Sequence, residues 1–144
     1  MQNNFVLSDF LNYLNDLPLI RYIKTCVIAV SKSGNTPETL VQLSTLKAYY
    51  KNQGLNINDH LLILCQHDEN ALFEYARKNK VLCTEHSNDI GGRFAVFAEV
   101  GQLTSYLTGF DVNSFYEGAN KAINELQNNT SDVASYSKII AENF

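Results

Sequence analysis

Proline and glycine are scarce in this 144-residue sequence, which contains two of the former and seven of the latter. Collagen-like and proline-rich disordered chains are thereby excluded, and an apolar fraction of 45% indicates a chain that can build a core. No stretch approaches the ~20 apolar residues that cross a bilayer, and Met1–Asn4 lacks the basic and apolar segments of a secretory signal. We therefore expect one globular domain over residues 1–144, cytoplasmic and without membrane contact.

Positive charge is also in short supply, because 11 Lys and Arg residues stand against 15 Asp and Glu, for a net charge of -4. The basic residues are scattered along the chain and form no cluster. A surface of this kind has no electrostatic footprint for a polyanion. Nucleic acid and anionic membranes are therefore excluded as expected partners.

Residues that hold metals or form disulfides are few. Cys26, Cys65 and Cys83 are odd in number, include no Cys-x-x-Cys pair and lie in or beside apolar runs, so we expect three buried free thiols. The three histidines show no metal-binding spacing such as His-Glu-x-x-His. We expect neither a metal nor a cofactor.

The centre of the chain alternates apolar runs of strand length with helical patterns. The expected elements are a strand over Thr25–Val30, a helix from Pro37 to Gly54 with Thr36 as its N-cap, a strand over Leu61–Cys65, a helix over Asn70–Asn79 and a short strand over Val81–Cys83. This alternation indicates right-handed crossovers and a parallel sheet. The predicted fold class is α/β, a three-layer α/β/α sandwich with a small parallel sheet and helices on both faces.

Helical spacing of apolar residues continues outside this alternation. Further helices are expected over Ser8–Leu17, Phe94–Leu107 and Asn113–Leu126, and from Ser131 or Asp132 towards Phe144. The acidic pair Asp68-Glu69 is expected to cap the second central helix, because acidic side chains suit the first turn.

The first of two unusual segments is the loop Ser31–Thr36, between a predicted buried strand and a predicted helix. In open α/β sheets, ligands bind beyond the carboxyl ends of the strands. Three hydroxyls, a lysine and a glycine here adjoin the free N–H groups and positive dipole end of the helix, a combination that favours a phosphate monoester. The Gly-x-x-x-x-Gly-Lys order of a Walker loop is missing. An ordinary hydroxyl-rich turn with a capping threonine explains the pattern equally well.

The second segment, Asn88–Phe94, follows the third predicted strand. Gly91 and Gly92 permit close approach of a ligand to the backbone, and Arg93, one of three arginines, would neutralise an oxyanion. The alternative is a glycine turn with a surface arginine. Since Ser33 has no base recognisable in the sequence, we expect no covalent catalysis.

Together the two segments carry a family resemblance. The run AVSKSGNTPETL at Ala29–Leu40 resembles the phosphate loop of sugar-isomerase (SIS) domains, and NDIGGRF at Asn88–Phe94 resembles the signature of glucose-6-phosphate isomerases. The second motif, followed by a helix and Thr108–Asp111, narrows the resemblance from sugar-isomerase domains in general to the glucose-6-phosphate isomerase family. Order and spacing match from Ser8 to Leu126, and the resemblance is to the middle portion of the family's N-terminal SIS domain.

The resemblance implies an intramolecular isomerase of glycolysis and gluconeogenesis that interconverts glucose 6-phosphate and fructose 6-phosphate through a cis-enediolate. The phosphate ligands that it implies are Ser31, Lys32 (largely through its backbone), Ser33 and Thr36. It assigns Gly92 and Arg93 to the neighbourhood of the reacting carbons, where a permanent positive charge suits an oxyanion. Glu38 matches an acid near the ring-opening machinery, although a first-turn partner of the helix dipole is an equal interpretation.

The sequence also departs from the family pattern. An upstream glycine-rich phosphate loop has no counterpart, nor does the downstream domain with the glutamate base, ring-opening histidine and lysine. Ala95 stands where the family usually has a hydroxyl residue, and Glu99 where it prefers a small one. We therefore expect a partial SIS domain, inactive alone, whose exposed edges favour a homodimer or pairing with a complementing isomerase fragment. A sugar-phosphate-binding module without catalysis is the alternative.

Overall fold

The computed structural model describes residues 25–128. The chain divides into two compact units, with the boundary between Phe94 and Ala95. The first unit contains a sheet and its helices, and the second, in its described part, contains helices. The helices expected over Ser8–Leu17 and beyond Ser131 lie outside the described residues.

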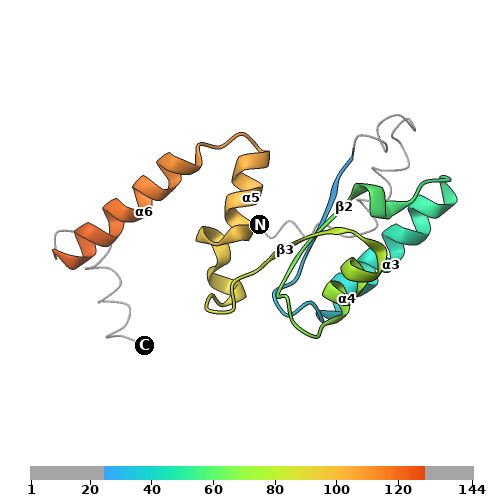
Figure 1. Cartoon of the computed structure of the whole chain (residues 1–144). Helices are drawn as coiled ribbons and strands as arrows, with labels where there is room; N and C mark the ends of the chain where they lie inside the picture. Colours follow the sequence, from blue (N-terminus) through green and yellow to red (C-terminus); the bar gives the residue numbers. More distant parts are fainter. Residues whose placement is uncertain (1–24, 129–144) are drawn as a thin grey trace. The chain divides into compact units, whose positions relative to one another are not determined.

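Strands and helices alternate in the first unit as predicted. They are β1 (Val27–Val30), α3 (Pro37–Asn52), the 3-10 helix η1 (Ile57–His60), β2 (Leu61–Cys65), α4 (Ala71–Asn79) and β3 (Leu82–Glu85). The strands form a parallel sheet in the order β1-β2-β3, with Ala29 opposite Ile63 and Ile63 opposite Cys83 (Figure 1). The predicted α/β class with a small parallel sheet is confirmed, while β3 is displaced towards the C-terminus of the predicted strand.

Helices α3 and α4 cover the same face of the sheet (Figure 1). The core cluster combines alternate strand residues such as Ala29 and Ile63 with side chains of α3 and α4, namely Leu43, Leu46, Tyr50, Leu72 and Ala76. Right-handed crossovers put successive helices on one face whenever strand order follows chain order. Within residues 25–94, α3 and α4 thus form one layer, whereas the predicted sandwich has helices on both faces of the sheet.

The helix ends follow the local sequence. Pro37 is the first residue of α3, where its fixed φ is compatible with the helix and its missing N–H costs nothing. Asn70 caps α4, since its Oδ1 accepts a hydrogen bond of 2.9 Å from the Phe73 N–H. The expected cap by Asp68-Glu69 is wrong, because Asn70 occupies the cap and donates to the Asp68 carboxylate at 2.6 Å.

The thiols differ in their surroundings. Cys65 is buried, and its Sγ lies 3.8 Å from that of the half-buried Cys83 on the neighbouring strand. Burial, reinforced by Cys83, raises the pKa of the Cys65 thiol to about 12. Cys26 is exposed, so the expectation of three buried thiols is wrong for this residue, which precedes β1 and lies outside the core cluster.

The second unit begins within a turn. The 3-10 helix η2 (Gly92–Phe97) leads to α5 (Glu99–Leu107) and α6 (Val112–Gln127). The single helix predicted over Phe94–Leu107 is wrong at its start, because the chain turns at Ala98 before α5 begins. The turn passes so close to Gly101 that a Cβ there would lie 1.7 Å from the Val96 carbonyl oxygen. No helix among the described residues is long and apolar enough to span a membrane.

Candidate functional site

The loop Ser31–Thr36 begins as an extension of the sheet. The Ser31 N–H donates to the Leu64 carbonyl at 3.1 Å, and the Gln66 N–H donates to the Lys32 carbonyl at 2.9 Å. Ladder hydrogen bonds between β1 and β2 therefore continue past the end of β1. The start of the loop is held as firmly as the strand itself.

The middle of the loop rests on the N-terminus of α4. The Gly34 carbonyl accepts from the Leu72 N–H at 3.1 Å, and Asn35 Oδ1 accepts from the Ala71 N–H at 2.9 Å. Gly34 has a φ of +64°, and a Cβ there would lie 1.8 Å from Asn70 Oδ1. Only glycine satisfies both the backbone angle and this contact. Sequence reasoning missed the support from Asn35 and Asn70, and the sole signal for it was an asparagine at a predicted helix start.

Two hydroxyls meet where the loop enters α3. Ser31 Oγ and Thr36 Oγ1 lie 2.7 Å apart, and Ser31 is buried. Thr36 occupies the N-cap position as predicted, but its side chain makes no capping hydrogen bond. Its hydroxyl is directed to Ser31 at the positive end of the helix dipole. Ser33 is exposed at the tip of the turn, where its Oγ lies 3.3 Å from the Asn35 N–H.

Lys32 connects the two unusual segments. Its Nζ donates to the carbonyl oxygens of Asn88 at 2.9 Å and of Ile90 at 2.7 Å. The segment Asn88–Phe94 therefore lies against the loop Ser31–Thr36 at the carboxyl edge of the sheet, as the topology requires. The two segments meet through the Lys32 side chain, a contact that sequence reasoning had not predicted.

The remaining sequence-derived site residues are exposed. Gly92 and Arg93 are the first two residues of η2, and Glu38 is the second residue of α3. The Arg93 guanidinium is always charged and is accessible from solvent. Glu38 has the position of a first-turn acid, which leaves its helix-dipole interpretation standing beside the catalytic one.

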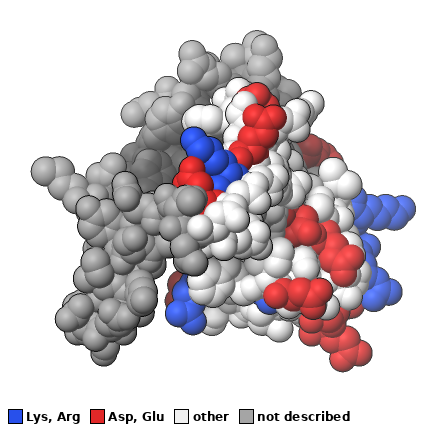
Figure 2. Space-filling view, turned by 90° about the vertical axis from the view of Figure 1, so that its left-hand side faces the viewer, with Lys and Arg blue, Asp and Glu red and all other residues white. Residues whose placement is uncertain are grey.

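Charge elsewhere on the described surface is mixed. On the face shown in Figure 2, Asp and Glu lie among Lys and Arg, some of them side by side, with uncharged residues around them. Among residues 25–128, no group of three or more His, Cys, Asp and Glu side chains is arranged to hold a metal. At the loop, the N-terminus of α3 offers an anion its positive dipole end, and Arg93 is exposed on the segment that Lys32 contacts.

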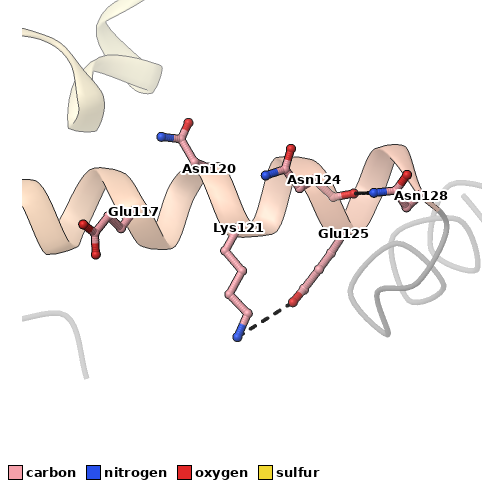
Figure 3. A pocket seen from close by; sticks show the side chains of 6 residues that line it. All are labelled: Glu117, Asn120, Lys121, Asn124, Glu125 and Asn128. Carbon is pink, nitrogen blue, oxygen red and sulfur yellow. Dashed lines mark hydrogen bonds and ion pairs between the residues drawn. The ribbon is translucent and has the colours of Figure 1, made fainter.

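A separate hollow lies beside α6, and none of the motif residues lines it. Its volume is about 390 Å³, and its lining comes from one helix, as Figure 3 shows: Glu117, Asn120, Lys121, Asn124, Glu125 and Asn128. Lys121 and Glu125 form an ion pair of 3.9 Å, and the exposed side chains contribute little stability through it. The arrangement is that of a solvated helix face, so it is no competitor for the loop site.

Comparison with known proteins gives one consistent family. The chain is 31% identical over 120 residues to a glucose-6-phosphate isomerase of Thermus thermophilus, matching 78% of this chain and 29% of that protein. It is 32% identical over 133 residues to the glucose-6-phosphate isomerase of Mycoplasma mycoides, matching 88% of this chain and 31% of the relative. No family model matches the chain.

Solved structures agree with the sequence relatives. A crystal structure of a hypothetical protein from Thermus thermophilus superposes with a TM-score of 0.68 at 30% identity, over 88% of this chain and 29% of the other. A glucose-6-phosphate isomerase from Chlamydia trachomatis superposes with a TM-score of 0.56 at 25% identity, over 70% of this chain and 18% of the other. The chain thus spans 29% to 31% of the length of these two sequence relatives.

Proposed function

Because the chain is a partial, glucose-6-phosphate isomerase-like family member, we propose that its loop Ser31–Thr36 binds the phosphate of a sugar 6-phosphate. The observation that carries this proposal is the pair of hydroxyls, Ser31 Oγ and Thr36 Oγ1, which lie 2.7 Å apart at the N-terminus of α3. Since Thr36 does not cap the helix with its side chain, its hydroxyl is placed to serve a ligand.

The loop offers a phosphate several neutral donors and little direct charge. Ser31, Ser33 and Thr36 supply hydroxyls, while the helix supplies N–H groups and its dipole. Lys32 contributes its backbone, because its ammonium group is engaged with the segment after β3. We expect an affinity on the order of millimolar, about -4 kcal/mol, for a site with so few charged contacts.

Arg93 and Gly92 would lie beside the reacting carbons of the bound sugar. Aldose-ketose isomerisation moves a proton between adjacent carbons and builds negative charge on an enediolate oxygen, which a fixed guanidinium stabilises. The proton transfer needs a positioned general base, worth about 100- to 10,000-fold in rate. Glu38 is an exposed first-turn carboxylate that we assign near ring opening, not to this transfer. We propose that these 144 residues by themselves bind substrate without isomerising it.

The second unit supports a partner as part of this function. Val96, Tyr106, Leu107 and Phe110 are exposed large apolar residues of this unit. Exposed large apolar side chains favour association with a partner that covers them. We propose a homodimer, or pairing with a complementing isomerase fragment, in the cytosol.

The binding proposal is tested by titrating the full 144-residue chain with inorganic phosphate and with fructose 6-phosphate while following backbone amide signals. We expect ligand binding to shift the backbone amide signals of Ser33 and Thr36. Thr36→Val should weaken binding of both ligands about tenfold, the loss typical of a hydrogen bond to a charged group. The matched control is Thr45→Val in the same helix, whose hydroxyl bonds only the helix backbone at Val41, and it should bind as the wild type does.

A coupled assay tests the catalytic half of the proposal. A preparation free of host isomerase should show no turnover of glucose 6-phosphate. Turnover that Arg93→Ala abolishes would contradict the proposed inactivity and reveal a base within the chain. Amide shifts confined to other residues, with none at Ser33 or Thr36, would contradict the binding site itself.

A further inference from the structure

Lys32 belongs to the phosphate loop, yet its ammonium group contacts a different part of the chain. Nζ donates to Asn88 O at 2.9 Å and to Ile90 O at 2.7 Å, across 56 and 58 positions of sequence. Both carbonyls belong to the segment that leads from β3 into Gly91-Gly92-Arg93. An ammonium group has three donors and no acceptor, so two carbonyls of one short segment occupy most of its hydrogen-bonding capacity.

One end of this contact is rigid. The Lys32 carbonyl accepts from the Gln66 N–H at 2.9 Å, and the preceding N–H, that of Ser31, donates to Leu64 O at 3.1 Å. The lysine backbone is therefore part of the β1–β2 ladder. Its side chain starts from a point that moves with the sheet.

The other end has little apolar packing to hold it. Gly91, Gly92 and Arg93 are all exposed, and a Cβ at Gly92 would meet nothing within 4 Å. Burial of apolar surface therefore does not determine the path of the backbone at Arg93. The hydrogen bonds from Lys32 to the carbonyls just before Arg93 can fix the path of the backbone there.

We propose that Lys32 is a positioning residue, whose ammonium group sets the distance between the phosphate loop and Arg93. This inference rests on the proposed function and deepens it. A sugar phosphate contacts the loop through one end and Arg93 through the other, whereas inorganic phosphate contacts the loop alone. Lys32 thereby determines how much more tightly the site binds a sugar 6-phosphate than inorganic phosphate.

The test compares two affinities in each variant of the full chain, measured by amide titration with inorganic phosphate and with fructose 6-phosphate. Removing the lysine charge changes the attraction for phosphate in both ligands alike, so the ratio of the two dissociation constants isolates the positioning effect. In Lys32→Met this preference for fructose 6-phosphate should fall about tenfold, the size of a lost hydrogen bond to a charged group. Lys32→Arg keeps the positive charge and the hydrogen-bond donors, so it should retain most of the preference for fructose 6-phosphate. Lys78→Met, at an exposed lysine of α4, is the matched control and should keep it in full.

A double-mutant cycle links the effect to Arg93. Arg93→Ala should lower the preference by itself, and adding Lys32→Met to it should lower it no further, because both changes remove the same contact. Lys32→Gln, which shortens the side chain and removes its charge, carries the same expectation if Lys32→Met does not fold. The amide signals of Gly91, Gly92 and Arg93 should also shift in the ligand-free Lys32→Met protein.

The failures of this inference and of the proposed function are distinguishable. If Lys32→Met still shifts Ser33 and Thr36 on binding and keeps the wild-type preference, the positioning role is overturned and the binding site stands. If both ligands weaken equally, Lys32 is itself a phosphate ligand and the positioning role is again overturned. If neither ligand shifts Ser33 or Thr36 in the wild type, the proposed function fails and the role of Lys32 fails with it.

Discussion

The two units of this chain bury their apolar residues very differently. In residues 25–94, side chains of the sheet, α3 and α4 form a common core cluster that includes Ile63 and Leu72. In residues 95–128, α5 and α6 contain no buried residue, and Ala95 and Ala98 before them are the buried positions. The first unit has a core that supports its loop, whereas the second exposes apolar side chains that a bound partner would shield from water.

The contrast follows from strand and helix geometry. A parallel strand such as β2 is hydrogen-bonded on both sides and packs its apolar side chains against two helices at once. The helices α5 and α6 have no sheet to pack against, and Phe97 of η2 stacks on Phe115 of α6 with the ring centroids 4.6 Å apart. The proposed site lies entirely in the unit with the complete core.

The largest expected effect is on stability in the first unit. Ile63→Ala removes side-chain atoms from a residue with no solvent exposure and should lower the free energy of unfolding by about 2–5 kcal/mol. Ile123→Ala in α6, where the side chain is 50% exposed, should change it by less than about 0.5 kcal/mol. Urea unfolding measures both. Equal costs would break the comparison, because they would mean that α6 is buried in solution.

The next effect concerns association. Phe110 in the second unit is 73% exposed and Leu82 in the first is 70% exposed, so they form a matched pair. Phe110→Ser should weaken self-association about tenfold, since burial of a large apolar side chain is worth about 1.5–3 kcal/mol. Leu82→Ser should leave it unchanged. Sedimentation at several protein concentrations measures the association constant of each variant. A larger loss of association in Leu82→Ser than in Phe110→Ser would mean that the first unit forms the interface.

A further prediction concerns the dependence of stability on alkaline pH, which reports how completely water is excluded from the Cys65 thiol in the first unit. Burial raises the pKa of Cys65 from 9.0 to about 12 in the folded protein. Above pH 9 the unfolded thiol loses its proton while the folded thiol keeps it, so stability falls between pH 9 and about 12. Below pH 9 this contribution is fully present.

Unfolding curves of Cys65→Ala should therefore decline less steeply with pH than those of the wild type. The matched control is Cys26→Ala, because Cys26 is exposed, and its decline should follow that of the wild type. A Cys65→Ala protein with the wild-type slope would show that water reaches this thiol.

Much of the first unit could be predicted because its signals are local. Apolar runs of strand length mark β1 and β2, Pro37 marks the start of α3, and Asn70 marks the start of α4. The hydroxyls of the loop were also visible as a pattern. The contact between them was not, because a threonine whose side chain caps a helix and one that contacts a serine, as Thr36 contacts Ser31, look the same in the sequence.

Two of the predictions that failed concern the environment of a residue. Cys26 adjoins an apolar run and is exposed, and the helix pattern starting at Phe94 is interrupted at Ala98 by a turn packed against Gly101. Periodicity reports which side chains are apolar, but not which neighbours they meet.

By itself, the sequence determined the order of the helices and strands along residues 25–128, since hydrogen bonding within helices and the alternation of apolar runs are local properties. It also marked two segments as candidates for a site. Only the tertiary structure decided that α3 and α4 share one face, that Gly34 rests against Asn70 and that Lys32 reaches the carbonyls of Asn88 and Ile90. These contacts join residues 36 to 58 positions apart. Their partners are selected by how the packed sheet brings its loops together, which no local pattern encodes.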